Sequence, residues 1–182
     1  MKRKTFDYLV SWIGVILTLA FLGASVGLFI GHSFDSNQIK SQLAREQVYF
    51  PTSSELKGMP ESISKYLGPY AGQQVVNGRE AEVFADHYIA VHLKEIGGGK
   101  TYSELSGECL ANPNNTTVCA EASKYFQGDT LRGLLLNAYA FWIFGQMALV
   151  GAWGLLGLGL VMAFLTALGL RHYQKVDPEV AI

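Results

Sequence analysis

The residues best suited to chemistry lie in one predicted helix, where two histidines and several carboxylates occur together. His87 and His92 could bind a metal ion with Glu82, Asp86 or Glu95. Five residues of helix, however, turn the two imidazoles about 140° apart. Helical metal pairs are usually four residues apart, as in His-Glu-x-x-His. We therefore expect His87 to pack inside the protein, His92 to be hydrogen-bonded or exposed, and no metal to bind.

A pair of carboxylates is the other candidate for catalysis. Glu82 and Asp86 are neighbours on one helix face and could act as an acid and a base. Both lie on a polar stripe that begins at Arg79, so we expect them to be solvated. In the middle of the chain, Ser53, Ser54, Ser103 and Ser106 lack the Gly-x-Ser-x-Gly setting that marks one class of nucleophile. The sequence therefore predicts no catalytic residue and no cofactor site.

Two long uncharged segments must position everything else in this chain of 182 residues. Tyr8–Ile30 and Gly133–Leu170 contain no Asp, Glu, Lys or Arg, and each exceeds the roughly 18 apolar residues of a spanning helix. The first is too long for the apolar region of a signal peptide, so we interpret it as an uncleaved anchor. The second contains no loop signal, so we expect one long helix that begins near Asp129.

Short basic flanks predict the orientation. Lys2, Arg3 and Lys4 precede the first segment, and Arg171 and Lys175 follow the second. Basic residues favour the cytoplasmic side of a membrane. We therefore expect a protein of the plasma membrane that has both termini in the cytoplasm and the middle of its chain outside. The predicted parts are a cytoplasmic tail at 1–7, a transmembrane helix at 8–31, an extracytoplasmic helical domain at 32–145, a second transmembrane helix at 146–170 and a cytoplasmic tail at 171–182.

The fold class is therefore an all-α membrane protein with a small extracytoplasmic domain. A helical pattern continues the first segment to about residue 48, and Pro60 is well placed to open a short helix. Further turns of helix are expected up to Val76. The central helix of the domain is predicted at 79–96, and Thr101 with Glu104 forms a capping-box pattern for the next helix.

Both cysteines, Cys109 and Cys119, lie in the predicted external domain, where thiols oxidise. They flank a Pro-Asn turn at 112–115 between two helix-like segments, so a disulfide is the first interpretation. It should contribute about 2–3 kcal/mol in the chain-entropy model. Metal binding by two cysteines with no nearby histidine is the weaker alternative.

Small residues in both uncharged segments indicate close helix packing. Gly23, Gly27 and Gly31 lie on one helix face because they are four residues apart. The second segment repeats the pattern at Gly159, Ala163 and Ala167. We favour pairing of these two faces within the chain, and packing on another protein is the alternative.

Aromatic residues crowd the first part of the second segment. The group comprises Asn137, Tyr139, Phe141, Trp142 and Phe144. Such rings suit the boundary between membrane and water. The group is therefore either an anchoring belt or a contact surface for another membrane subunit.

Residues 81–102 and 129–142 resemble a family of actinobacterial two-span membrane proteins. Members of the family are often described as ring-opening dioxygenases. The sequence shows no iron triad of two histidines and a carboxylate, so we do not expect that activity here.

The size and topology also resemble the small accessory membrane subunit of the corynebacterial cytochrome bcc–aa3 respiratory supercomplex. The resemblance implies a non-catalytic subunit that docks on and stabilises larger subunits, with no cofactor of its own. Cytochrome bcc and aa3 oxidase subunits and membrane lipid are the expected partners. Nucleic acid is not an expected partner, because acidic residues slightly outnumber basic ones in the external part of the chain.

Two other functions stay open at this point. One is a membrane-anchored extracytoplasmic enzyme that uses a metal, and the other is a small oligomeric transport component. Transport proteins usually carry ionisable groups inside the bilayer, and neither uncharged segment has an Asp, Glu, Lys or Arg.

Overall fold

The computed structural model describes residues 3–175 and, apart from Arg3, their side chains. Lys2 and the predicted tail beyond Lys175 lie outside the described residues. All regular secondary structure within residues 3–175 is helical, as the sequence predicts. The chain divides into two compact units, which we describe separately. Unit 1 contains residues up to Phe34 and from Gly145 onward, and unit 2 contains Asp35–Phe144.

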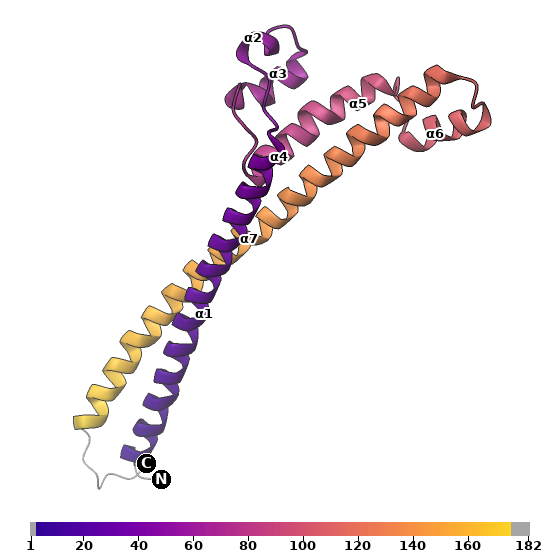
Figure 1. The fold of residues 1–182 in the computed structure, drawn as a ribbon. Helices are drawn as coiled ribbons and strands as arrows, with labels where there is room; N and C mark the ends of the chain where they lie inside the picture. Colours follow the sequence, from indigo (N-terminus) through magenta and orange to yellow (C-terminus); the bar gives the residue numbers. More distant parts are fainter. Residues whose placement is uncertain (1–2, 176–182) are drawn as a thin grey trace. The chain divides into compact units, whose positions relative to one another are not determined.

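Unit 1 is a pair of antiparallel helices (Figure 1). They are the first part of α1, which spans Arg3–Glu46, and the last part of α7, which spans Thr116–Lys175. Both helices are long and apolar enough to cross a membrane, and only 11% of the most apolar window of each is buried. The core helix of a soluble protein would be mostly buried. The expectation of two long apolar helices is therefore confirmed.

Helix α7 is one unbroken helix, as the lack of a loop signal predicts. It begins at Thr116 rather than near Asp129, however, so the predicted start is wrong. The polar residues that precede the apolar segment also form helix, because they pack on the central helix of unit 2. Gly128 permits this packing, since a Cβ atom there would lie 2.7 Å from Leu93 Cδ2.

The two helices of unit 1 meet along small residues that recur every seven positions. On α7 these are Gly145, Ala152, Gly159 and Thr166, and on α1 they include Ser11, Thr18 and Ser25. Ala152 and Ser25 are almost fully buried. A seven-residue repeat keeps one seam of each helix facing its partner in a left-handed supercoil, and small residues let the backbones approach closely.

The predicted glycine face of α1 lies outside this seam. A Cβ atom added to Gly23, Gly27 or Gly31 would meet nothing within 4 Å. The predicted pairing of this face with α7 is therefore wrong. Packing on another protein, the alternative, stays a prediction for these three glycines.

The matching face of α7 is only partly in the seam. A Cβ atom on Gly159 would lie 2.7 Å from Leu22 Cδ2. Ala163 is half-buried, whereas Ala167 is exposed. The four-residue spacing thus identifies Gly159 correctly but follows the wrong period along the helix.

Unit 2 is a compact helical unit. It contains the end of α1, the beginning of α7 and, between them, α2 (Ser53–Leu56), α3 (Glu61–Leu67), the 3₁₀-helix η1 (Gly68–Tyr70), α4 (Gly78–Phe84), the π-helix η2 (Ala85–Ile89), α5 (Ala90–Ile96) and α6 (Tyr102–Ala111). Helices α4, η2 and α5 run on without a break and form the central helix that the sequence predicts at 79–96. The π-helical turn within it was not predicted.

The core of unit 2 gathers apolar side chains from most of its helices, and α6 contributes none. It contains Ile39, Leu43, Phe50, Leu56, Ile63, Leu67, Val75, Ala81, Val83, Phe84, Ala85, Ile89, Leu93 and Leu135. Leu67 and Val75 are completely buried. At about 25 cal/mol per Å² of buried apolar surface, a core of this kind is the main source of stability in a small domain.

Local signals explain several helix ends. Pro60 precedes α3 as predicted. Thr101 and Glu104 form the predicted capping box of α6, in which the Thr101 backbone N–H lies 2.7 Å from Glu104 Oε2. This hydrogen bond, together with one from the Thr101 hydroxyl, holds the pKa of Glu104 below its ordinary value. The same reciprocal pattern opens α2 and α4.

The predicted helix up to Val76 is wrong. Beyond η1 the chain is extended and pairs with residues that follow α1. The Phe50 N–H donates to the Gln73 carbonyl oxygen at 2.9 Å, and the Val75 N–H donates to that of Val48 at 2.9 Å. Burial of Val75 in the core outweighs the local helical tendency, because an extended β-branched residue fills that position well.

Candidate functional site

The two histidines singled out by the sequence have different surroundings. The His87 ring stacks on Tyr66 of α3, with centroids 3.7 Å apart and planes 3° from parallel. His92 Nδ1 lies 2.8 Å from the carbonyl oxygen of Tyr88 in the preceding turn. His92 is thus hydrogen-bonded, as expected. No group of three or more His, Cys, Asp and Glu residues is close enough to hold a metal within residues 3–175.

The acidic stripe of the central helix is less solvated than the sequence indicates. Arg132 of α7 donates from Nη2 to Asp86 Oδ1 at 2.7 Å, and both side chains are only about one-third exposed. Glu82 lies 3.5 Å from Arg79 and is one-fifth exposed. The Asp86–Arg132 pair therefore ties the π-helix to α7, a structural role that the expectation of a solvated stripe missed.

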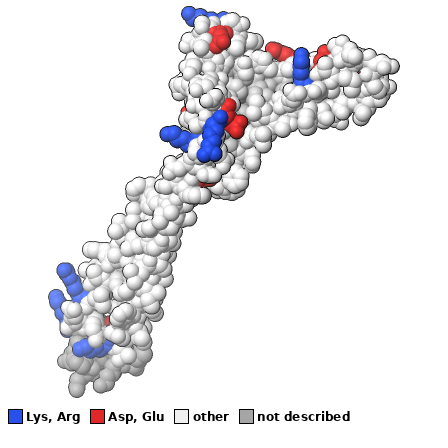
Figure 2. All heavy atoms as spheres, in the orientation of Figure 1, with Lys and Arg blue, Asp and Glu red and all other residues white. Residues whose placement is uncertain are grey.

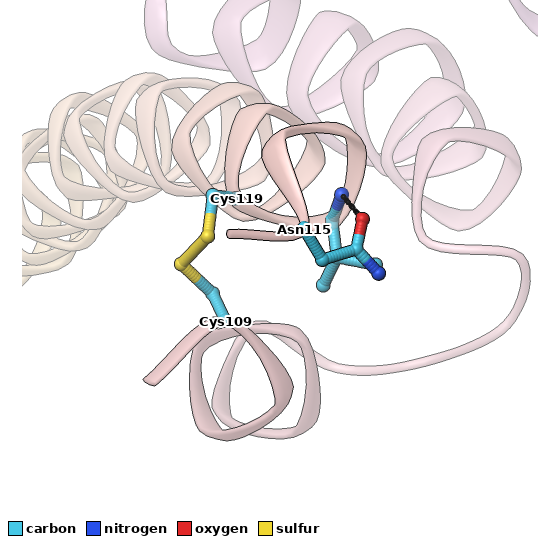
Figure 3. The surroundings of a disulfide bond; sticks show 4 residues. Cys109, Asn115 and Cys119 are labelled. Carbon is cyan, nitrogen blue, oxygen red and sulfur yellow. Dashed lines mark hydrogen bonds between the residues drawn. A yellow bond between two sulfur atoms is a disulfide. The ribbon is translucent and has the colours of Figure 1, made fainter. Parts of the chain in front are cut away.

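Cys109 and Cys119 form the predicted disulfide (Figure 3), with their Cα atoms 4.9 Å apart. It joins the last turn of α6 to the first turn of α7. Beside it, the Val118 N–H donates to Asn115 Oδ1 at 3.3 Å, which caps the start of α7. The predicted helical hairpin, with its turn at 112–115, is confirmed.

Polar contacts in unit 1 link the two helices. Ser25 Oγ donates to the Ala152 carbonyl oxygen at 2.8 Å, and the Ser25 side chain is buried. His32 Nδ1 lies 2.9 Å from the Gly145 carbonyl oxygen. In an apolar environment a hydroxyl or imidazole without a partner costs several kcal/mol. These contacts therefore favour one register of the pair over a shifted one.

The predicted aromatic contact group separates into two sets on α7. Trp142 packs against the core of unit 2, where it lies directly beside Gly78 of α4. Tyr139 is half-buried and stacks on Trp142, with ring centroids 6.0 Å apart. These two residues stabilise the fold and leave little surface for another protein.

The remaining members point away from the core. Phe141 and Phe144 are 55% and 67% exposed, and Leu134 on the same side is 64% exposed. Together with exposed Asn137 they lie within about 80° around the helix axis. We call these four residues the outer face of α7. Three large apolar groups on one face exceed the scattered exposure that is normal for a protein surface.

The outer face is the best candidate for a functional surface in unit 2. The sequence spacing could have separated this face from the residues that pack in the core. Leu135, Ala138 and Trp142 fall on a neighbouring face of the same helix. Leu134 was missed because the aromatic cluster was delimited by composition and not by helix angle.

Comparisons of the chain with protein-family models, with curated proteins and with solved structures found no match.

Proposed function

We propose that this protein is a non-catalytic, membrane-anchored accessory subunit that binds and stabilises a larger membrane complex through the outer face of α7. The observation that carries the proposal is the exposure of Leu134, Phe141 and Phe144 on a helix whose neighbouring face is packed in the core. Exposed apolar groups on one face are typical of a protein or membrane contact.

The unbroken course of α7 supports the proposal that the partner is an integral membrane protein. Helix α7 continues from the outer face into the apolar part of unit 1 without a break. A helix that leaves the bilayer with apolar groups on its surface can place them beside the external part of an integral membrane protein. The resemblance to the accessory subunit of the cytochrome bcc–aa3 supercomplex makes subunits of that complex the proposed partners.

The proposed topology has both ends in the cytoplasm and unit 2 outside. The described charged residues of unit 1 support it, because Lys4, Arg171 and Lys175 all lie beyond the outermost apolar turns. In intact cells, a membrane-impermeant thiol reagent should label a cysteine placed at exposed Ser123. It should not label one placed at Lys175. Labelling at Lys175 would contradict this topology.

Docking predicts a specific loss on mutation. Phe144→Ser should weaken co-purification of cytochrome bcc and aa3 subunits with the tagged protein by about thirtyfold or more, because a central interface residue is worth about 2 kcal/mol or more. Leu110→Ser is the matched control. Leu110 is 77% exposed in the same unit, but it lies on α6, so its replacement should leave co-purification unchanged.

The same experiment separates docking from a simple anchoring belt. If the outer face meets only lipid headgroups, Phe144→Ser and Leu110→Ser should both leave the recovered subunits unchanged. Equal recovery from the two variants, with both proteins folded, would therefore contradict docking through this face.

A further inference from the structure

The charged groups of unit 1 gather at one end, where α1 begins and α7 ends (Figure 2). Among the described side chains of this unit, the basic ones are Lys4, Arg171 and Lys175, and the acidic one is Asp7. Arg171 and Lys175 are exposed and Lys4 is half-exposed. This end therefore presents basic groups to its surroundings.

Asp7, the acidic residue among the described side chains of this unit, reduces this positive charge only in part. The Asp7 side chain is 19% exposed, and its Oδ2 atom lies 4.0 Å from His172 Nε2. The carboxylate is thus turned toward the helix pair. The net charge of the four groups is positive, because three cations accompany one anion.

Aromatic rings join the two helices beside Lys4. The Tyr8 ring lies 5.8 Å from Tyr173 of α7 and 6.2 Å from Trp12, measured between centroids. Lys4 Nζ lies 5.6 Å from the Tyr173 centroid, a distance at which a cation is attracted to a ring. The contact holds an ammonium group of α1 over a ring of α7. Tyrosine and tryptophan favour the depth of lipid headgroups.

The surface that borders the cluster is apolar. On α1, Leu9 and Ile13 are 49% and 57% exposed, and on α7, Leu165 and Leu168 are 54% and 46% exposed. A soluble anion would match only the cations, and an apolar chain would match only this border. A molecule with a phosphate and acyl chains matches both.

We propose that this end of unit 1 is a binding site for an anionic phospholipid such as phosphatidylglycerol. Lys4, beside Tyr173, and Arg171 and Lys175, on the opposite side of α7, contact lipid phosphates, and the acyl chains lie along the exposed apolar residues. The inference depends on the membrane insertion that the proposed function assumes. It adds a preference among lipids, which neither anchoring nor docking requires.

The test uses the full chain, purified in mild detergent and incubated with equal amounts of phosphatidylglycerol and phosphatidylcholine. Mass spectrometry then counts the lipids retained. Wild-type protein should retain mainly phosphatidylglycerol. Each cation removed should lower the preference by up to about fivefold, since a basic group near an anionic lipid surface contributes about 1 kcal/mol. The variant K4Q/R171Q/K175Q should therefore show almost no preference.

Two further variants control for charge and folding. K57Q/K94Q/K124Q removes the same charge from exposed positions of unit 2 and should keep the preference. K4R/R171K/K175R keeps the charge and should therefore also keep the preference for phosphatidylglycerol. An excess of soluble glycerol 3-phosphate should not displace the bound lipid, because it has no acyl chains.

The proposal is overturned if wild-type protein retains both lipids equally, if the unit 2 control loses the preference as fully as K4Q/R171Q/K175Q, or if glycerol 3-phosphate displaces the lipid. Failure to dock on respiratory subunits leaves these results unaffected. The lipid site and the proposed function can therefore fail separately.

Discussion

Replacing Gly159 with leucine should strongly destabilise the helix pair of unit 1. Gly159 is buried, and the first atom of any side chain there would lie 2.7 Å from Leu22 Cδ2 and 3.0 Å from its Cγ. A leucine adds three further carbon atoms to that space. Overpacking of this kind costs about 1–3 kcal/mol and occasionally more. Thermal unfolding in mild detergent, followed by circular dichroism, should show a lower midpoint.

Gly27→Leu is the matched control for this experiment. It makes the same change in the interior of α1, but a Cβ atom at Gly27 meets nothing within 4 Å. Leucine also has the better helix propensity, by up to about 1 kcal/mol. The midpoint of Gly27→Leu should therefore equal or exceed that of the wild type. A larger loss at Gly27 than at Gly159 would show that the seam described here is wrong.

The second large effect is expected for Gly78→Leu in unit 2. A side chain at Gly78 would collide with Trp142 at its Cβ and Cγ atoms and would lie 3.1 Å from the Tyr139 Cα. The Trp142 Cβ and the Tyr139 Cα are fixed by the backbone of α7, so rotation of the Trp142 side chain can move its Cγ but cannot relieve the contact. Helix α4 and α7 must separate, at a cost of at least about 1–3 kcal/mol.

Gly133→Leu provides the comparison for Gly78. Gly133 is an exposed residue of α7 in the same unit, and a Cβ atom there meets nothing within 4 Å. Limited proteolysis should cleave unit 2 faster in Gly78→Leu than in the wild type, whereas Gly133→Leu should resemble the wild type. Equal protection of both variants would contradict the packing of Trp142 on α4.

Much of the secondary structure could be predicted, because its signals are local. Proline marked the start of α3, a Thr-x-x-Glu pattern marked that of α6, and two cysteines around a turn marked the hairpin. The two long helices followed from the length of uncharged sequence. In each case residues close together in the chain determine the outcome.

The errors arose where distant residues decide the structure. The extended segment at Val75 depends on partners more than twenty residues away, and the Asp86–Arg132 pair joins positions 46 apart. Neither can be read from local periodicity. The π-helical turn likewise has no signal in the spacing of apolar residues.

The seam of unit 1 is a different case, because its signal was present in the sequence. Small residues recur every four positions at Gly23, Gly27 and Gly31, and this pattern predicted the wrong face. They also recur every seven positions from Gly145 to Thr166, and the structure follows this longer repeat. Both spacings have a counterpart on the other helix, so spacing alone does not distinguish them. Contacts between the helices, such as the hydrogen bond from Ser25 Oγ to the Ala152 carbonyl oxygen, identify the seven-residue seam.

The candidate contact surface was partly predictable for the same reason. Composition identified the aromatic cluster, but only the helix angle separates Trp142, which packs inward, from Phe141 and Phe144, which are exposed. The identity of a partner for these residues rests on resemblance and therefore needs a direct measurement.

Cross-linking from the outer face tests the central claim most directly. A photoreactive phenylalanine analogue at position 144, activated in living cells, should form a covalent adduct with a subunit of cytochrome bcc or aa3, which mass spectrometry identifies. The same analogue at position 110 on α6 should not form that adduct. If position 144 yields only lipid adducts or adducts within its own chain, the outer face of α7 does not dock on a respiratory complex.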